Sequence, residues 1–381
     1  MIEVVTGKQK WSALVEAKIG LSSLETDQIE RYLSLAKENS VDAVITVSNE
    51  FAARPHHHPI AVSKRLTGKV SLYHFSWTSL LTSAILLQEQ AAISDPEQAF
   101  LLREFIRFFP HHSVGISHFT LMPQEWTTAI ERFKAGGKIS RGEIGNSVVN
   151  GWHQELKDLT LIMSCMIGCE IKVNLSRAHE TDPKARLKDD VDKLRKNGQL
   201  TTTLIIPDAA ADLEITADLK SRTIRASMTV GAPLDKKKST TRLKWLLRLL
   251  KAVEPENISV EIIWKSKARN DHFALAELIQ HPERIGQVTH SSEVGKFKIT
   301  LTTTNPNKFE RRKNFVEELK TLALQYYETI GQFLQNWTPS PPTPTHSVTV
   351  AAQTKSDIHE AGNSSSDLLE IPDLLLRQRA T

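Results

Sequence analysis

The residues whose types and spacing could do chemistry lie between Trp11 and Tyr32. Glu16 and Lys18 are two positions apart, so on a strand their side chains share one face. Gln28 and Tyr32 are four positions apart, which places them on one face of a helix. A carboxylate oxygen is a ligand that Mg²⁺ or Mn²⁺ prefers, and a bound metal ion activates water and neutralises charge on a phosphate. A lysine adds a cation beside the attacking water or the scissile phosphate. The combination therefore indicates metal-dependent hydrolysis of a phosphodiester bond.

Two strands, a helix and a third strand are predicted to position these side chains. Ile2–Val5 and Trp11–Ile19 read as two strands joined by a polar, glycine-containing turn. An amphipathic helix is predicted from Thr26 to Asn39, and Val41–Val47 is β-branched and almost entirely apolar, as is typical of a buried central strand. A strand–helix–strand order implies that the strands flanking the helix pair in parallel. We therefore expect an α/β sheet domain with the Glu16 strand inside it.

The pattern Glu16-Ala17-Lys18 on a strand, followed by Gln28 and Tyr32 on the next helix, resembles the PD-(D/E)XK nuclease superfamily, in its RecB-type branch. The resemblance implies a restriction endonuclease-like α/β core of order αβββαβ and a Mg²⁺- or Mn²⁺-dependent nuclease, a hydrolase that binds and cuts DNA. It implies that Glu16 and the Ala17 carbonyl ligate the metal and that Lys18 orients or activates the attacking water. Gln28 and Tyr32 would contact the DNA backbone or brace the site.

The sequence departs from this family at the first acidic ligand, an Asp on the strand before Glu-x-Lys. Pairing the hairpin about its turn sets Val5 opposite Trp11, which places the partner of Glu16 before Met1. The leading helix and first strand of the family are also missing. We therefore expect an N-terminally incomplete core, with Met1 an internal methionine of a longer protein.

Two functions stay open, and whether this chain is an enzyme is uncertain. One is a metal-dependent nuclease that becomes active when the missing Asp is supplied. The other is a catalytically inactive nuclease-like module that binds nucleic acid or protein, because the metal-binding Asp is absent.

The domain organisation follows from changes in composition. Residues 1–135 are the nuclease-like domain, and 136–146, which begins with two glycines and is mostly polar, is a linker. Residues 147–337 mix strands and helices and form an α+β domain of unassigned fold. Residues 338–381 are rich in Pro, Ser and Thr and are predicted to be a disordered tail. The acidic and apolar segment from Asp367 in this tail is a candidate docking motif for a protein partner.

A basic helix in the second domain is the candidate DNA contact. Net charge is only +4, but cations cluster in 236–251. Lys244, Arg248 and Lys251 form a stripe opposite a leucine stripe, a footprint suited to phosphate backbones. A solvated helix face with no partner is the alternative.

Other features restrict the function class. No apolar run reaches the length of a membrane span, so no membrane partner is expected. Cys165 and Cys169 are expected to be buried small hydrophobes of a cytoplasmic protein. The run His56–His58 is predicted to be an exposed loop, whereas His74 lies in a strand and could approach the site. The sequence contains no nucleophile elbow, P-loop or dinucleotide fingerprint.

Overall fold

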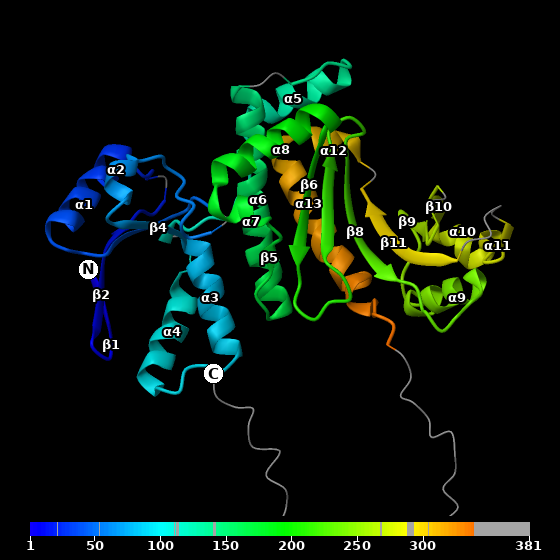
Figure 1. The fold of residues 1–381 in the computed structure, drawn as a ribbon, viewed down its shortest axis with the longest axis horizontal. Helices are drawn as coiled ribbons and strands as arrows, with labels where there is room; N and C mark the ends of the chain where they lie inside the picture. Colours follow the sequence, from blue (N-terminus) through cyan, green and yellow to red (C-terminus); the bar gives the residue numbers. More distant parts are fainter. Residues whose placement is uncertain are drawn as a thin grey trace, which may run out of the picture. The chain divides into compact units, whose positions relative to one another are not determined.

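Two β-sheets, each with its own hydrophobic core, organise the fold in a computed structural model (Figure 1). The structure describes residues 1–338 except 21, 53, 110, 112–113, 140–141, 267–268, 288–292 and 304. These residues group into one compact unit, Met1–Thr338. The chain is a mixed α/β protein, as predicted. The predicted tail lies outside the described residues, apart from Thr338.

The first sheet has the strand order β1-β2-β3-β4. Its strands are β1 (Ile2–Thr6), β2 (Gln9–Ala17), β3 (Ala43–Ser48) and β4 (Ser71–Ser76). Strands β1 and β2 are antiparallel, whereas β2, β3 and β4 are parallel, which confirms the predicted crossover. Helix α1 (Thr26–Glu38) makes that crossover and buries Ile29, Leu33 and Ala36 against the sheet. These positions recur at helical spacing, so the apolar stripe of α1 fixes which of its faces looks at the strands.

The β1–β2 hairpin is tighter than predicted. Val5 pairs with Lys10, and Trp11 pairs with Val4, so the predicted Val5–Trp11 pairing is wrong by one residue. The loop has only two residues, Gly7 and Lys8, because Gly7 adopts a φ of 60°. A glycine at the first position of a two-residue loop matches the twist of the flanking strands.

The second sheet has the order β10-β9-β11-β8-β7-β6-β5, and its neighbouring strands are all antiparallel. Its strands are β5 (Lys172–Val173), β6 (Gln199–Ile205), β7 (Leu213–Asp218), β8 (Thr223–Gly231), β9 (Ile258–Trp264), β10 (Asp271–Ala274) and β11 (Val294–Thr302). In β9 every second residue is buried, the period-2 pattern of a strand with one face in the core. This region has the α+β character that was predicted for it.

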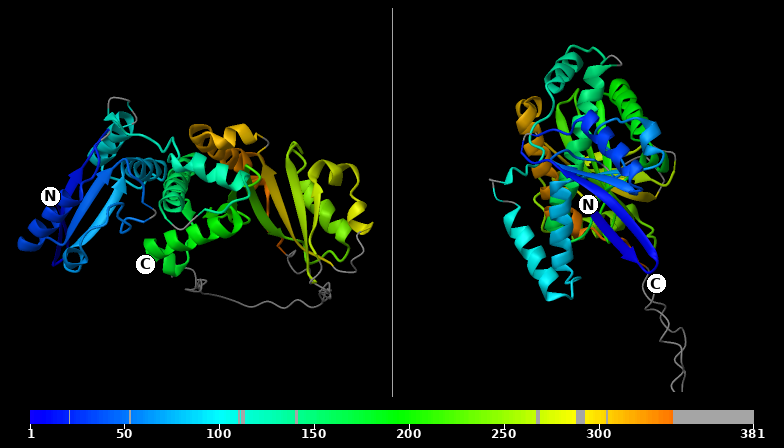
Figure 2. Two further views of the ribbon diagram at one scale, coloured as in Figure 1. Left: turned by 90° about the horizontal axis from the view of Figure 1, so that it is seen from above. Right: turned by 90° about the vertical axis from the view of Figure 1, so that its left-hand side faces the viewer.

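Helices pack against both sheets. The helices beyond α1 are α2 (Lys64–Thr67), α3 (Trp77–Glu89), α4 (Pro96–Phe108), α5 (Glu125–Lys134), α6 (Glu143–Ile167), α7 (Arg177–Thr181), α8 (Pro183–Asn197), α9 (Ser239–Leu249), α10 (Leu275–Gln280), α11 (Arg284–Gln287), α12 (Pro306–Glu310), α13 (Arg312–Thr329) and the 3-10 turn η2 (Gly331–Phe333). Helix α13 packs on β8 and β11 and is drawn in orange in Figure 2. None of the described helices is long and apolar enough to cross a membrane.

Helix α5 belongs to the core of the second sheet. Trp126 is fully buried, its ring centroid is 4.2 Å from that of Phe315, and its Nε1 donates to the Phe309 carbonyl. The prediction assigned this helix to residues 1–135, but the second core already begins at Met122. The two cysteines also differ from expectation, because Cys165 and Cys169 are half-buried rather than buried.

Candidate functional site

The structure brings together the four polar side chains singled out by the sequence. Gln28 Nε2 donates to Glu16 Oε1 at 2.9 Å and to the Tyr32 hydroxyl at 3.2 Å. Lys18 Nζ lies 3.1 Å from the same Glu16 Oε1. The carboxylate comes from β2 and the amide and phenol from α1, so the cluster joins two elements. The stripe of Ile29 and Leu33 sets this geometry, because it presses α1 onto the sheet with Gln28 and Tyr32 beside β2.

The backbone around the Glu-x-Lys element is held on both sides. Ala17 pairs with Val47 of β3, and the Lys18 amide donates to the Val47 carbonyl at 2.8 Å. The Lys18 carbonyl accepts from Trp77 Nε1 at 2.7 Å, at the start of α3. The side chains of Glu16 and Lys18 remain 19% and 24% exposed. A ligand can therefore reach a site whose backbone is rigid.

A polar row continues across the same sheet face, made of His74, which was expected to be able to approach the site, and Thr46, which the sequence did not single out. The parallel register pairs Glu16 with Thr46 and Thr46 with His74, and paired residues point to the same side. Thr46 and His74 are buried, and Thr46 Oγ1 lies 2.9 Å from His74 Nδ1 and 2.8 Å from His58 Nε2. His74 Nε2 is 2.9 Å from the Glu50 carbonyl. His74 thus reaches the row that contains Glu16, at the carboxyl ends of the parallel strands, where open α/β sheets bind ligands.

The His56–His58 segment is not the exposed loop that was predicted. His56 is exposed, but His57 is buried and its Nε2 lies 2.6 Å from the Glu180 carbonyl. His58 is half-buried between Thr46 and the Ile60 backbone. Burial, with a smaller contribution from nearby His74, lowers the pKa of His58 from 6.5 to about 4.

We expect the folded state to lose stability in acid through His58. A histidine whose native pKa is depressed stabilises the fold above its unfolded pKa, and this contribution is lost as the pH falls from 6.5 through about 4. Urea unfolding between pH 7.5 and 4, followed for the parent and for His58→Asn, measures the effect. The variant should show a shallower decline over this interval. Equal slopes would contradict a neutral, half-buried His58.

The described residues offer an incomplete set of metal ligands. Among them, no group of three or more His, Cys, Asp or Glu side chains is placed to hold a metal ion. Glu16 and the Ala17 carbonyl are hard oxygen donors of the kind Mg²⁺ prefers. The Lys18 and Gln28 contacts both fall on Glu16 Oε1, so neither occupies Oε2. This donor set suits an ion that keeps several waters and takes its other ligands from substrate phosphates, as Mg²⁺ does.

The predicted basic stripe is exposed, but only Lys244 and Arg248 lie on α9, because the helix ends before Lys251; the three cations are called the α9 stripe. Lys244, Arg248 and Lys251 are exposed, while Leu243 and Leu246 on the opposite side are buried. These three cations have no ion-pair partner among the described residues. Their charges are thus available to a polyanion.

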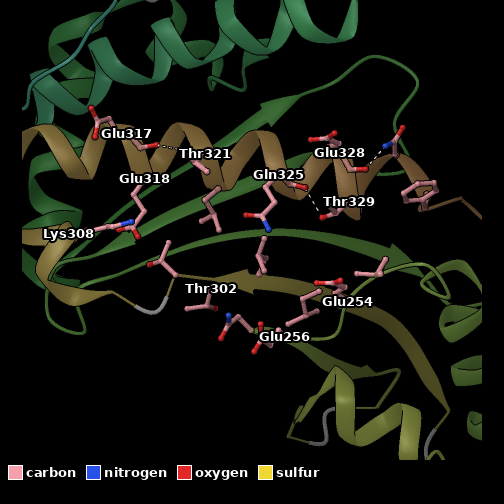
Figure 3. A pocket seen from close by; sticks show the side chains of 18 of the residues that line it. Glu254, Glu256, Thr302, Lys308, Glu317, Glu318, Thr321, Gln325, Glu328 and Thr329 are labelled. Atoms are coloured by element: carbon pink, nitrogen blue, oxygen red, sulfur yellow. Dashed lines mark hydrogen bonds between the residues drawn. The ribbon is translucent and has the colours of Figure 1, made fainter.

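A cavity of about 840 Å³ in the described chain lies elsewhere and has the wrong charge for a nucleic acid. It lies between α13, the ends of β9 and β11, and 252–257. Figure 3 shows the glutamates that line it, and Lys308 is the one lysine among its described lining residues. The lining glutamates are Glu254, Glu256, Glu317, Glu318 and Glu328. A phosphate backbone would be repelled there.

Comparisons with known proteins identify no relative of this chain. No family model matches the sequence, no curated protein matches it, and no solved structure matches the fold.

Proposed function

We propose that this chain is a metal-dependent hydrolase of DNA phosphodiester bonds with its centre at Glu16 and Lys18. The observation that carries the proposal is the convergence of Glu16, Lys18, Gln28 and Tyr32 through three polar contacts. The strand and helix order β1-β2-α1-β3 also agrees with the last four members of the αβββαβ order that the PD-(D/E)XK resemblance implies.

Each residue of the cluster has a separate role in this proposal. Glu16 and the Ala17 carbonyl would hold Mg²⁺, which supplies charge neutralisation at the phosphate and a more acidic bound water. Lys18 orients the attacking water and stabilises negative charge on the phosphate. Gln28 fixes the Glu16 carboxylate through its amide and positions Tyr32. Because Trp77 and Val47 hold the backbone of Lys18, this lysine keeps its place when substrate binds.

A second function, DNA binding without cleavage, is favoured by one observation. The described residues supply one carboxylate to the cluster and no group of three metal ligands. Such a module would use the nuclease-like sheet and the α9 stripe for binding alone.

Cleavage and binding assays on the same protein separate the two functions. Supercoiled plasmid and linear duplex DNA are incubated with the chain in Mg²⁺, Mn²⁺ or EDTA, and binding is followed by fluorescence anisotropy. Metal-dependent cleavage supports the hydrolase. Binding with no cleavage in either metal supports the binding module. If DNA is neither cut nor bound, both proposals fail.

Removing the α9 stripe is expected to weaken DNA binding. The triple variant Lys244→Ala, Arg248→Ala and Lys251→Ala should bind duplex DNA roughly 10-fold more weakly at moderate salt. The slope of log affinity against log salt should become shallower by about 2 to 3, since each phosphate contact contributes about 0.9. Anisotropy titrations at several salt concentrations measure both values.

A matched triple variant controls for the loss of net charge. Lys37, Lys138 and Lys196 are also exposed, and they lie outside α9. Their replacement by alanine should leave the salt slope nearly unchanged. If both triple variants weaken binding equally, the α9 stripe is not a specific contact.

A further inference from the structure

A second cavity, of about 730 Å³, lies beside the first sheet and has the opposite charge to the acidic one. It is bounded by 50–62 and β4 on one side and by α6 and α8 on the other. Hydrogen bonds join these two sides, because His56 and His57 both reach the carbonyl of Glu180, and Arg54 pairs with its carboxylate at 2.8 Å. These contacts therefore hold the two walls of the cavity together within the compact unit.

Arg186 is the lining residue that most clearly indicates a ligand, because its hydrogen-bond donors lack partners in the part of the chain that the structure describes. It is only 5% exposed, yet it is one of the residues that line the cavity. Its ion-pair partner is Asp190 at 3.8 Å, and it donates no hydrogen bond to any described residue. Asp190 is already shared with His153 at 2.9 Å and Lys193 at 3.0 Å. A guanidinium has five N–H donors, and none of those of Arg186 is both fully buried and unpartnered, so its free donors are accessible to a ligand. An anion in the cavity would satisfy them.

The other charges around the cavity also favour an anion. Lys64 of α2 and Lys184 of α8 line it from opposite sides, and both are exposed. The carboxyl group among its lining residues belongs to Glu50, and burial raises the pKa of that group, which favours its neutral form. Three cationic side chains therefore line the cavity, against one carboxyl group whose pKa is raised.

The remaining lining suits a nucleoside. The amides of Asn150 and Gln154 provide donors and acceptors, and Phe51, Tyr73 and Leu187 provide apolar and aromatic surface. A flat base can stack on aromatic side chains and bond through its edge to amides. The volume falls in the range of ordinary small-ligand pockets, about 300 to 1,000 Å³.

We propose that this cavity binds a nucleoside phosphate, with Arg186 and Lys184 on the phosphate and the Asn150–Gln154 side on the base. Arginine matches phosphate oxygens with two parallel hydrogen bonds, which explains a planar cation at the buried end. The ligand is either a free nucleotide or the terminal nucleotide of a strand. The site is separate from Glu16, requires no metal, and stands whether or not the chain cleaves DNA.

Calorimetric titrations in EDTA test the proposal with AMP, adenosine and a short oligonucleotide that carries either a 5′-phosphate or a 5′-hydroxyl. AMP should bind at least about 10-fold more tightly than adenosine, because only AMP has the phosphate. Lys184→Glu should weaken AMP binding by at least about 10-fold. Lys188→Glu, on the same helix but outside the cavity, should change it less than about twofold.

Arg186 is tested with two variants, because a buried residue can affect folding. Arg186→Gln should weaken AMP binding and leave adenosine binding unchanged, and Arg186→Lys should restore part of the loss. If Arg186→Gln does not fold, Lys184→Glu decides. Tighter binding of the 5′-phosphorylated oligonucleotide than of AMP assigns the site to a strand end, and the reverse assigns it to a free nucleotide.

The proposal is overturned if AMP and adenosine bind alike, or if Lys184→Glu binds AMP as the parent does. Lys18→Ala should bind AMP normally. Loss of DNA cleavage with intact AMP binding would therefore separate a failure at Glu16 from a failure of this cavity.

Discussion

Replacing Lys18 with alanine is expected to lower the rate of metal-dependent DNA cleavage by about 100- to 1,000-fold, the usual cost of removing one charge-stabilising group. Lys18 is the cation next to the Glu16 carboxylate, at 3.1 Å, and it is 24% exposed. Its loss removes the positive charge where negative charge develops on the phosphate. Gln28 still holds Glu16, so the carboxylate keeps a partner and the fold should be retained. Single-turnover cleavage of a labelled duplex measures the rate.

Lys10→Ala is the matched control. Lys10 lies on the same strand, pairs with Glu3 across the hairpin at 2.8 Å, and is 60% exposed. Since it lies outside the cluster, its loss should change the rate by less than about threefold, in line with the small value of exposed ion pairs. Thermal unfolding and DNA anisotropy should be similar for both variants and the parent. A Lys18→Ala protein that cleaves as fast as Lys10→Ala would refute the site assignment.

Local periodicity explains why the Glu16 cluster could be predicted from sequence. Residues two apart on a strand and four apart on a helix share a face whatever the rest of the fold does. The apolar stripe of α1 then turns the chosen face of the helix toward β2. The β-branched run at β3 also specified a buried parallel strand, and Ala43 and Val44 are fully buried. These inferences needed contacts only between neighbouring elements.

The sequence indicated that His74 could approach the site, but it did not predict that Thr46 and His74 form a polar row with Glu16. Thr46 and His74 are level with Glu16 only through the register of two parallel pairings. A register shift of one residue sends every side chain to the other face, and sequence alone left that register open. The one-residue error in the β1–β2 hairpin shows how easily such a shift occurs.

The place of α5 and the burial of Arg186 depend on contacts between residues far apart in the sequence, so the sequence did not predict them. Trp126 and Phe309 meet across 183 positions, so the sequence could not show that α5 joins the second core. Helix α8 does carry a start signal, since Asp182 accepts from the amides of Lys184 and Ala185 and Pro183 follows it. Its buried Arg186 could not be predicted, because arginine is seldom buried without a close partner.

Lys320 lies in a buried charge cluster between α6 and α13, and replacing it is expected to lower the free energy of unfolding strongly. Glu155 and Asp158 are both fully buried, three positions apart on α6. Lys320 Nζ donates to Asp158 Oδ2 and to the Phe119 carbonyl, each at 2.6 Å, and lies 3.5 Å from Glu155 Oε2. Lys320→Met should therefore cost about 3–5 kcal/mol of unfolding free energy at pH 7, as expected when one partner of a buried ion pair is removed.

Urea unfolding of Lys320→Met and of Lys313→Met tests this expectation. Lys313 lies on the same helix and is 69% exposed, so its loss should change the free energy of unfolding by less than about 0.5 kcal/mol. Equal effects of the two substitutions would show that the cluster does not depend on its cation.

The pH dependence gives an independent check on the same cluster. Burial raises the pKa of Glu155 well above its ordinary value, and Lys320 opposes that rise. A carboxyl whose native pKa is raised stabilises the fold below its unfolded pKa, near 4.5, and this contribution is lost as the pH rises through the native pKa. Without Lys320 the native pKa rises further, so the stability lost to Lys320→Met should shrink as the pH falls toward 5. A loss that is constant between pH 5 and 8 would mean that Lys320 acts through packing and not through its charge.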